Sequence, residues 1–358
     1  MLPFLSKTLL FPYWLTLKIR HFLYDSGIFK ETAYPVPVVC VGNITVGGTG
    51  KTPFTEMIIR HLQDKYRIAV LSRGYKRESK GFVLATENST HREIGDEPLQ
   101  IKKKFPETIV AVCEDRREGI EKLLQAEQKP DIIILDDAFQ HRKVKPSHSV
   151  VLMNFNRPIF GDNLLPIGRL RDLPEQIKRA QSVVITKSPL FGERNGIILE
   201  EEALEEIGRI EGEWRRKLRL SGRQELYFST TSYGAPVPVC PNIADTRYLY
   251  TRSAIFFTGI ANDSEFASYM SDKYSVEGSI KFADHCNFTK SDINKINSWA
   301  KKHPGSAIYT TEKDSKRLIG NAYLSKDVQQ RLFYIPIETN IIPQSRKTLF
   351  FNQILSNL

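Results

Sequence analysis

Six short apolar runs in the first half of this 358-residue chain restrict its fold more than any other feature. Each is rich in Val and Ile and too continuous for a strand with one face in water. They occupy residues 35–41, 67–72, 108–113, 131–136, 149–154 and 182–187. Helical patterns separate them, and strands that alternate with helices form a parallel, doubly wound sheet. We therefore predict an α/β fold whose ligand site lies beyond the carboxyl ends of the strands.

A glycine-rich loop follows the first run and reads GNITVGGTGKTP over residues 42–53. Its Gly-Lys-Thr matches the end of the phosphate-binding P-loop motif, and Thr45 takes the place of the motif's first glycine. Glycines let successive backbone N–H groups turn toward phosphate oxygens. A turn without a ligand is the alternative, but a strand before the loop and a helix after it favour nucleotide binding. The predicted nucleotide-binding residues are Thr45, Val46, Gly47, Gly48, Thr49, Gly50, Lys51 and Thr52.

Two of these residues have specific expected roles. Lys51 is expected to reach the β and γ phosphates, and Thr52 to bind Mg²⁺ at the start of a helix. A P-loop also needs an acidic group at the end of a neighbouring strand to hold the metal. Asp136 and Asp137 follow four consecutive apolar residues and fit that position, so either of them is expected to bind Mg²⁺ directly or through water.

A second, shorter alternation of strand and helix patterns fills residues 254–337. This length is enough for a smaller α/β domain beside a P-loop NTPase-like domain. We predict four parts along the chain. They are an amphipathic N-terminal membrane-associating segment at 1–30, a P-loop kinase domain at 31–222, a smaller α/β domain with connecting strands at 223–341, and a C-terminal helix at 342–358.

The N-terminal 24 residues are dense in Leu, Phe, Tyr and Trp. Their longest uncharged run, Thr8 to Leu17, has ten residues, whereas about 20 are needed to span a bilayer. No small-residue cleavage site follows it, so a signal peptide is not expected. Two alternatives stay open: an amphipathic helix in a membrane interface, with Lys18 and Arg20 near anionic headgroups, or a helix packed on the protein's own core.

The charge balance is basic, with 51 Lys and Arg against 41 Asp and Glu, a net charge of +10. Such an excess suits an anionic partner, either nucleic acid, a phosphorylated substrate or an acidic membrane. The four cysteines are far apart and form no CxxC pair, so neither a disulfide framework nor a zinc site is expected.

Asp96 lies in the stretch GDEP, directly before a helical pattern. It fits a helix N-cap that accepts backbone N–H groups. The alternative is a base that accepts a proton from an attacking hydroxyl. His285 is a candidate to orient such an aspartate, although a lone His between aromatic residues is more often structural. Four arginines have guanidinium groups that can bind phosphates, although each of them can equally serve only surface solubility. They are Arg116, Arg117, Arg169 and Arg171.

These motifs occur together with SRGYKR (72–77), EDRREG (114–119), DDAFQHR (136–142), PIGRLRDLPE (166–175), FADHCNF (282–288) and TTEKD (310–314). In this order, and up to about residue 340, the chain resembles the tetraacyldisaccharide 4'-kinases, which phosphorylate the lipid A precursor of Gram-negative bacteria. The resemblance implies ATP and Mg²⁺ as cofactors and a glycolipid whose 4' hydroxyl receives the γ-phosphate. It also implies a P-loop core and a smaller domain that close over the nucleotide.

The resemblance further implies a peripheral or monotopic enzyme at the cytoplasmic face of the bacterial inner membrane, with no obligate protein partner. It gives Asp96 the role of catalytic base with His285 as its partner. It assigns phosphate and metal roles to Lys51, Thr52, Asp136 and Asp137, and it places Arg117, His141 and Arg171 beside phosphates or substrate. The chain departs from the family pattern at Cys286, where a second His is common, and at Asp172, where Glu is common.

Two other classes compete with this hypothesis. A P-loop GTPase switch would carry an Asn/Thr-Lys-x-Asp element, and the candidate at 186–189 lacks its aspartate. A nucleic-acid-associated ATPase fits the net charge, but the sequence has no zinc finger, aromatic-basic RNA signature or separable basic tail. We therefore predict transfer of the γ-phosphate of ATP to the 4' hydroxyl of a tetraacyldisaccharide 1-phosphate, with no nucleic-acid partner.

Overall fold

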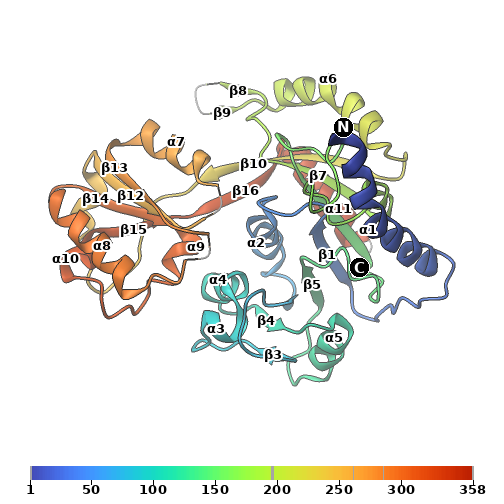
Figure 1. Ribbon diagram of the computed structural model, residues 1–358, viewed down its shortest axis with the longest axis horizontal. Coiled ribbons are helices and arrows are strands. Elements are labelled where there is room, and N and C mark those ends of the chain that lie inside the picture. The colour runs from blue at the N-terminus through green and yellow to red at the C-terminus, as the bar shows by residue number, and fades with distance from the viewer. Residues whose placement is uncertain (1, 195–196, 261, 285, 357–358) are drawn as a thin grey trace. The chain divides into compact units, whose positions relative to one another are not determined.

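The computed structural model describes residues 2–194, 197–260, 262–284 and 286–356 (Figure 1). The chain forms two compact units, Met1–Thr231 with Thr339–Leu358, and Ser232–Glu338. Two strands, β10 (Glu225–Tyr233) and β16 (Ile337–Ile342), carry the chain out of the first unit and back into it.

The large unit contains a nine-stranded sheet in the order β16-β10-β7-β6-β1-β5-β2-β4-β3. All six apolar runs of the sequence are strands of this sheet, and they pair in parallel, as predicted. These six strands are β1 (Val38–Asn43), β2 (Ile68–Ser72), β4 (Ile109–Val112), β5 (Ile132–Asp136), β6 (His148–Asn154) and β7 (Ser182–Thr186). The edge strand β3 (Val83–Leu84) pairs antiparallel with β4. Because β5, β1 and β6 are parallel neighbours, the segments that leave their carboxyl ends meet at one edge.

Helices cover both faces of this sheet. Val38 and Cys40 of β1 belong to one apolar core, and Val39 and Val41 to the other, as strand periodicity requires. Side chains from α1, α5 and α6 fill the first core, and side chains from α2, α4 and α11 fill the second. The helices are α1 (Leu2–Asp25), α2 (Lys51–Leu62), α3 (His91–Ile94), α4 (Asp96–Lys104), α5 (Arg116–Gln125), the 3₁₀ helix η1 (Pro174–Arg179), α6 (Glu200–Leu218) and α11 (Gln344–Ser356). Two short strands, β8 (Glu193–Arg194) and β9 (Ile197–Ile198), pair antiparallel with each other.

The small unit is the second α/β arrangement that the sequence predicts. Its sheet has the order β11-β15-β14-β12-β13, and the last four of these strands are parallel. The strands are β11 (Val237–Pro238), β12 (Ser253–Thr258), β13 (Ser275–Lys281), β14 (Ala307–Thr311) and β15 (Leu332–Ile335). The helices are η2 (Thr246–Tyr250), α7 (Ser264–Lys273), α8 (Lys290–Lys302), α9 (Glu312–Ser315) and α10 (Lys326–Arg331).

Among the side chains of helix α1 that the structure describes, from Leu10 onward, the buried ones lie on one side. Leu17 and His21 are 6% and 3% exposed, whereas Phe22 is 65% exposed. Phe11 and Trp14 are exposed as well. Among the helices that the structure describes, none is long and apolar enough to cross a membrane. The helix therefore has a packed side, which fits a helix on the protein's own core, and an exposed apolar side, which fits a helix in a membrane interface.

Candidate active site

The glycine-rich loop leaves β1 at Asn43 and enters α2 at Lys51. Gly47 and Gly50 have φ angles of +85° and +77°, in the left-handed region that glycine adopts without strain. Gly50 is the N-cap of α2, and no side chain caps the first turn of this helix. Backbone N–H groups at such a helix start, together with the helix dipole, form a site for an anion.

Side chains from neighbouring elements hold the loop in shape. The Asn43 side-chain amide donates a hydrogen bond to the Thr49 hydroxyl at 2.8 Å, and the Thr186 hydroxyl donates to the Thr49 carbonyl at 3.0 Å. The Val46 N–H donates to the Arg169 carbonyl at 2.8 Å. The loop is therefore fixed at its beginning, middle and end before a ligand binds.

The two acidic residues at the end of β5 lie in different environments. Asp136 is buried, and burial together with the charge of Asp137 raises the pKa of Asp136 to about 6. Asp137 has φ +50° and turns its carboxylate toward cations. Arg171 Nη1 donates to Asp137 Oδ2 at 3.1 Å, and Lys51 Nζ lies 3.7 Å from Asp137 Oδ1. Burial acts to raise the pKa of Asp137, but the hydrogen bond from Arg171 and the charge of Lys51 outweigh burial and lower it.

Arg171 also joins the loop to this acidic pair. Its Nη2 donates to the side-chain oxygen of Asn43 and to Asp137. The next residue, Asp172, is fully buried and lies with its Oδ1 2.6 Å from Nε2 of His21 on α1. The Tyr13 hydroxyl of α1 donates to the Arg171 carbonyl at 2.9 Å. Helix α1 thus supports the segment that carries Arg171.

The donor set at the end of β5 suits magnesium. Its carboxylate oxygens come from Asp136 and Asp137, and the Thr55 hydroxyl of α2 donates to Asp136 Oδ1 at 3.3 Å. Mg²⁺ is usually held by one or two carboxylates with substrate phosphates and water. Across the described ranges, no group of three or more His, Cys, Asp or Glu side chains could hold a metal.

Asp96 is the first residue of α4, and Gly95, with φ +90°, is the N-cap. The prediction that Asp96 is the N-cap of this helix is therefore wrong, because Gly95 is the N-cap and Asp96 follows it.

Helix α4 is fixed against α2 by a buried contact. The Gln100 side-chain amide and Lys104 Nζ each lie 2.7 Å from a carboxylate oxygen of Glu56, which is 1% exposed. This contact sets the position of Asp96 relative to the helix that begins at the loop.

The other predicted residues are distributed around this edge. Arg117 lies in the first turn of α5, and its Nη2 donates to Asp115 Oδ2 at 3.2 Å. His141 is half-buried, and burial with the charge of Arg116 lowers its pKa to about 4. His285 lies outside the described residues. The structure thus brings Lys51, Asp137 and Arg171 into direct contact, and it places Arg117 in a separate ion pair.

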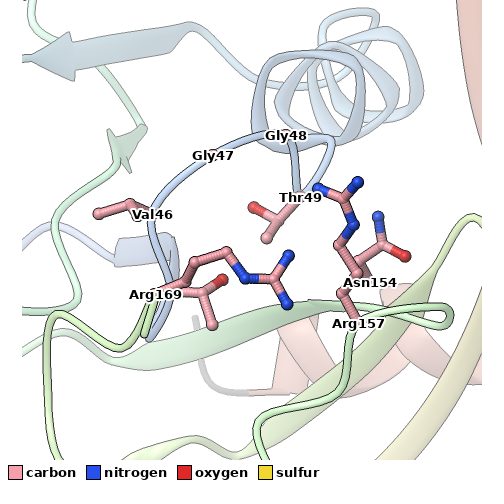
Figure 2. A pocket seen from close by; sticks show the side chains of 8 residues that line it. Val46, Gly47, Gly48, Thr49, Asn154, Arg157 and Arg169 are labelled. Atoms are coloured by element: carbon pink, nitrogen blue, oxygen red, sulfur yellow. The ribbon is translucent and has the colours of Figure 1, made fainter. Parts of the chain in front are cut away.

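Sequence reasoning missed part of the site. A pocket beside the loop is shown in Figure 2, and its lining residues are Thr45, Val46, Gly47, Gly48, Thr49, Asn154, Arg157 and Arg169. Asn154 and Arg157 come from the end of β6 and the turn after it. The sequence does show that polar residues follow the apolar run of β6. Only the parallel pairing of β6 with β1 places those polar residues beside the glycine-rich loop.

Comparison with known proteins gives one consistent result. The sequence model of the tetraacyldisaccharide-1-P 4'-kinase family matches residues 4–356. The chain is 39% identical over 349 residues to a tetraacyldisaccharide 4'-kinase of Bacteroides thetaiotaomicron, covering 94% of this chain and 87% of the relative. It is 40% identical over 342 residues to the enzyme of Flavobacterium johnsoniae, covering 94% of both. The crystal structure of LpxK from Aquifex aeolicus in complex with ATP is similar with a TM-score of 0.72 and 26% identity, over 98% of this chain and 99% of that one.

Proposed function

This chain belongs to the tetraacyldisaccharide-1-P 4'-kinase family, and on that premise we propose how its residues carry out the reaction. It is a kinase of lipid A biosynthesis that transfers the γ-phosphate of ATP to the 4' hydroxyl of the tetraacyldisaccharide 1-phosphate precursor. The observation that carries the residue roles is the contact of Lys51 and Arg171 with Asp137 at the mouth of the glycine-rich loop.

In this proposal, residues Thr45 to Thr52 bind the phosphates of ATP. The N–H groups of the loop and Lys51 neutralise the β and γ phosphates, because these groups are already fixed and need little rearrangement as charge develops. Arg171 keeps Asp137 in place, and Asn43 connects both to the loop. The support is that these groups converge at the carboxyl ends of β1 and β5.

Thr52, Asp136 and Asp137 would hold Mg²⁺. When bound, the metal neutralises charge on the phosphate oxygens during transfer. Asp136 is suited to this role only when it is ionised, and its pKa of about 6 means that most of it is ionised at pH 7. The lowered pKa of Asp137 keeps that carboxylate charged over a wider pH range.

Asp96 is proposed as the general base. The 4' hydroxyl oxygen attacks the γ-phosphorus, the bond from that phosphorus to the bridging oxygen of ADP breaks, and the hydroxyl proton goes to the Asp96 carboxylate. The buried Glu56 contacts that fix α4 support this assignment, since a base must be held in place. The orienting role of His285, and closure of the two units over the nucleotide, stay predictions.

Arg117, His141 and Arg171 are proposed to border phosphates or substrate. His141 is neutral near pH 7 because its pKa is lowered to about 4, so it acts through hydrogen bonding and not as a cation. Arg171 already contacts Asp137, so its action on the phosphates includes the placement of that carboxylate.

We further propose that the outer side of α1 binds the cytoplasmic face of the bacterial inner membrane, which makes the enzyme peripheral or monotopic. Exposed Phe11, Trp14 and Phe22 support this assignment, because aromatic side chains partition into the bilayer interface. The lipid A disaccharide precursor is the expected partner, and no nucleic acid or obligate protein partner is expected. The functional boundaries near residues 30, 222 and 341 stay predictions.

The function is tested by incubating the protein with ATP, Mg²⁺ and the tetraacyldisaccharide 1-phosphate, followed by mass analysis of the lipid. We expect the mass of one added phosphate group, with fragmentation placing it at the 4' position. The same reaction without lipid measures ATP hydrolysis. Rapid hydrolysis with no phosphorylated lipid would support an ATPase switch and contradict the kinase assignment.

A further inference from the structure

The pocket beside the glycine-rich loop concentrates positive charge. Five of its eight lining residues belong to the loop, and the others are Asn154, Arg157 and Arg169 (Figure 2). No Asp or Glu is among the eight. Two guanidinium groups on one small pocket repel each other unless an anion lies between them. The composition of the lining therefore favours an anionic ligand.

The backbone explains why Arg169 reaches this pocket. The segment around Leu170 runs antiparallel to the start of the loop and forms a bridge with Thr45. Leu170, which forms this bridge, is 2% exposed, and Arg169 and Arg171 flank it in bends of the chain. Arg171 contacts Asp137 and Asn43, whereas Arg169 lines the pocket. The two arginines that flank Leu170 thus reach the glycine-rich loop and its neighbour Asp137.

The Arg169 side chain is aligned by Asp162. Asp162 Oδ2 accepts from Arg169 Nε at 3.2 Å, and Asp162 Oδ1 accepts from the Arg169 backbone N–H at 3.2 Å. This pairing uses Nε, and within the described ranges no hydrogen bond involves the two terminal nitrogens of Arg169. Figure 2 shows the Arg157 and Arg169 guanidinium groups on the same pocket as Thr49. Both can therefore offer their planar donor groups to a phosphate.

We propose that Arg157 and Arg169 form a guanidinium clamp on the polyphosphate of the bound nucleotide, in addition to the loop N–H groups and Lys51. The proposal rests on the proposed function of the loop as the ATP site. The nucleotide is favoured over the phosphate of the lipid because five of the eight lining residues are loop residues. The clamp acts on phosphates that ADP and ATP share, so it contributes to nucleotide binding and not only to transfer.

The test is titration calorimetry with ADP and with ATP on the parent, Arg157→Gln, Arg169→Gln and the double variant. Each single change is expected to weaken the binding of both nucleotides about 10- to 100-fold, because a hydrogen bond to a charged group contributes about 1.5–3 kcal/mol and 1.4 kcal/mol is one factor of ten. Arg169→Lys is expected to recover part of the loss, since it restores charge without the planar fork. Arg209→Gln is the matched control, because Arg209 is an exposed arginine paired with Glu205 on α6.

A second arm separates the two sources of phosphate. The KM for the disaccharide is measured with and without its 1-phosphate in the parent and both single variants. Parent-like ADP and ATP affinity in the double variant would overturn the clamp, and so would a loss confined to the lipid that carries the 1-phosphate. These outcomes differ from failure of the kinase assignment, in which the parent itself binds ATP but leaves the lipid unphosphorylated.

Discussion

The two units each gather charged residues at the carboxyl ends of parallel strands, but the two groups differ in what they contact. In the large unit, Lys51 and Arg171 each pair with Asp137, and the three side chains are 20–38% exposed. In the small unit, the Asp314 and Arg317 side chains are 0% and 1% exposed. The first group is accessible to a ligand, and the second is enclosed.

The charged side chains of the enclosed group bind backbone and side-chain atoms of the protein itself. Asp314 Oδ2 accepts from the Gly259 N–H at 2.8 Å and from the Thr311 hydroxyl at 2.7 Å. Arg317 Nη1 donates to the Cys286 carbonyl at 3.2 Å. These contacts join the segments that follow β12, β13 and β14. A charged motif at a strand end is therefore not sufficient for a ligand site, and the exposure of its polar atoms distinguishes the two cases.

The largest expected effect is on the rate of the large unit's site. Asp96→Asn removes the proton acceptor but keeps the shape of the side chain, so kcat should fall about 10²- to 10⁴-fold, while the Kd for ATP stays near that of the parent. Steady-state kinetics and ATP titration measure the two quantities. A parent-like kcat would mean that Asp96 is only part of the helix start.

The opposite pattern is expected in the small unit. Asp314→Ala removes the acceptor of Gly259 and Thr311 and one partner of a buried ion pair, so the free energy of unfolding should fall by about 3–5 kcal/mol. The rate per folded enzyme should stay close to that of the parent. Urea unfolding and kinetics measured well below the unfolding midpoint test both parts.

The control for this change is Lys281→Ala. Lys281 forms an exposed ion pair with Asp263 in the same unit, and such pairs contribute about 0–1 kcal/mol. If Asp314→Ala cost no more than this control, the buried contacts of Asp314 would not stabilise the small unit, and the contrast between the two sheet edges would fail.

A smaller effect separates the two acids at the end of β5. The pKa of Asp136 is raised from 3.8 to about 6, so its ionisation destabilises the folded protein without ligand. The fold favours the neutral carboxyl group of Asp136, and the stability gained from it is complete below pH 3.8 and is lost as the pH rises through about 6. At pH 8, Asp136→Asn should raise the free energy of unfolding by roughly 2–3 kcal/mol while it weakens Mg²⁺-dependent activity.

Asp137 provides the matched comparison for this pH effect. Its pKa is lowered, so its ionised form stabilises the fold, and that contribution is lost as the pH falls through the lowered pKa. Asp137→Asn should therefore not stabilise the protein at pH 8. Urea titrations from pH 4 to pH 8 test both variants, and an equal gain in both would show that the two acids do not differ as described.

The smallest expected effect concerns α1, where a packed side and an exposed side occur on one helix. Phe22→Asp should weaken binding to anionic vesicles about tenfold, since an apolar contact with the interface is lost. Thr16→Asp adds the same charge at an exposed polar position and is the control. Sedimentation with vesicles measures both, and equal losses would indicate a charge effect alone.

Much of this architecture could be predicted because its signals are local. Continuous apolar runs predicted the six central strands, and the glycines before Lys51 predicted the loop. Asp136 and Asp137 followed from their position after a buried strand. All three signals depend on residues that are close in sequence.

The remaining features depend on long-range contacts. Arg157 reaches the loop only because β6 pairs with β1, and Arg169 only because its segment pairs with Thr45. The N-cap at Gly95 was missed because Asp is a common capping residue, and the sequence therefore predicts Asp96 as the cap. The burial of Asp314 depends on a hydrogen bond across 55 residues to Gly259, which no local pattern predicts.

The central claim is that phosphoryl transfer takes place at the glycine-rich edge of the large unit, and the most direct test is the single-turnover rate of Lys51→Ala. With saturating ATP, Mg²⁺ and disaccharide, labelled γ-phosphate is followed into the 4' position of the lipid. We predict a rate about 10²- to 10³-fold below that of the parent, because a fixed cation is lost where charge develops, with an unchanged unfolding midpoint. Transfer at the parent's rate by the folded variant would contradict the account.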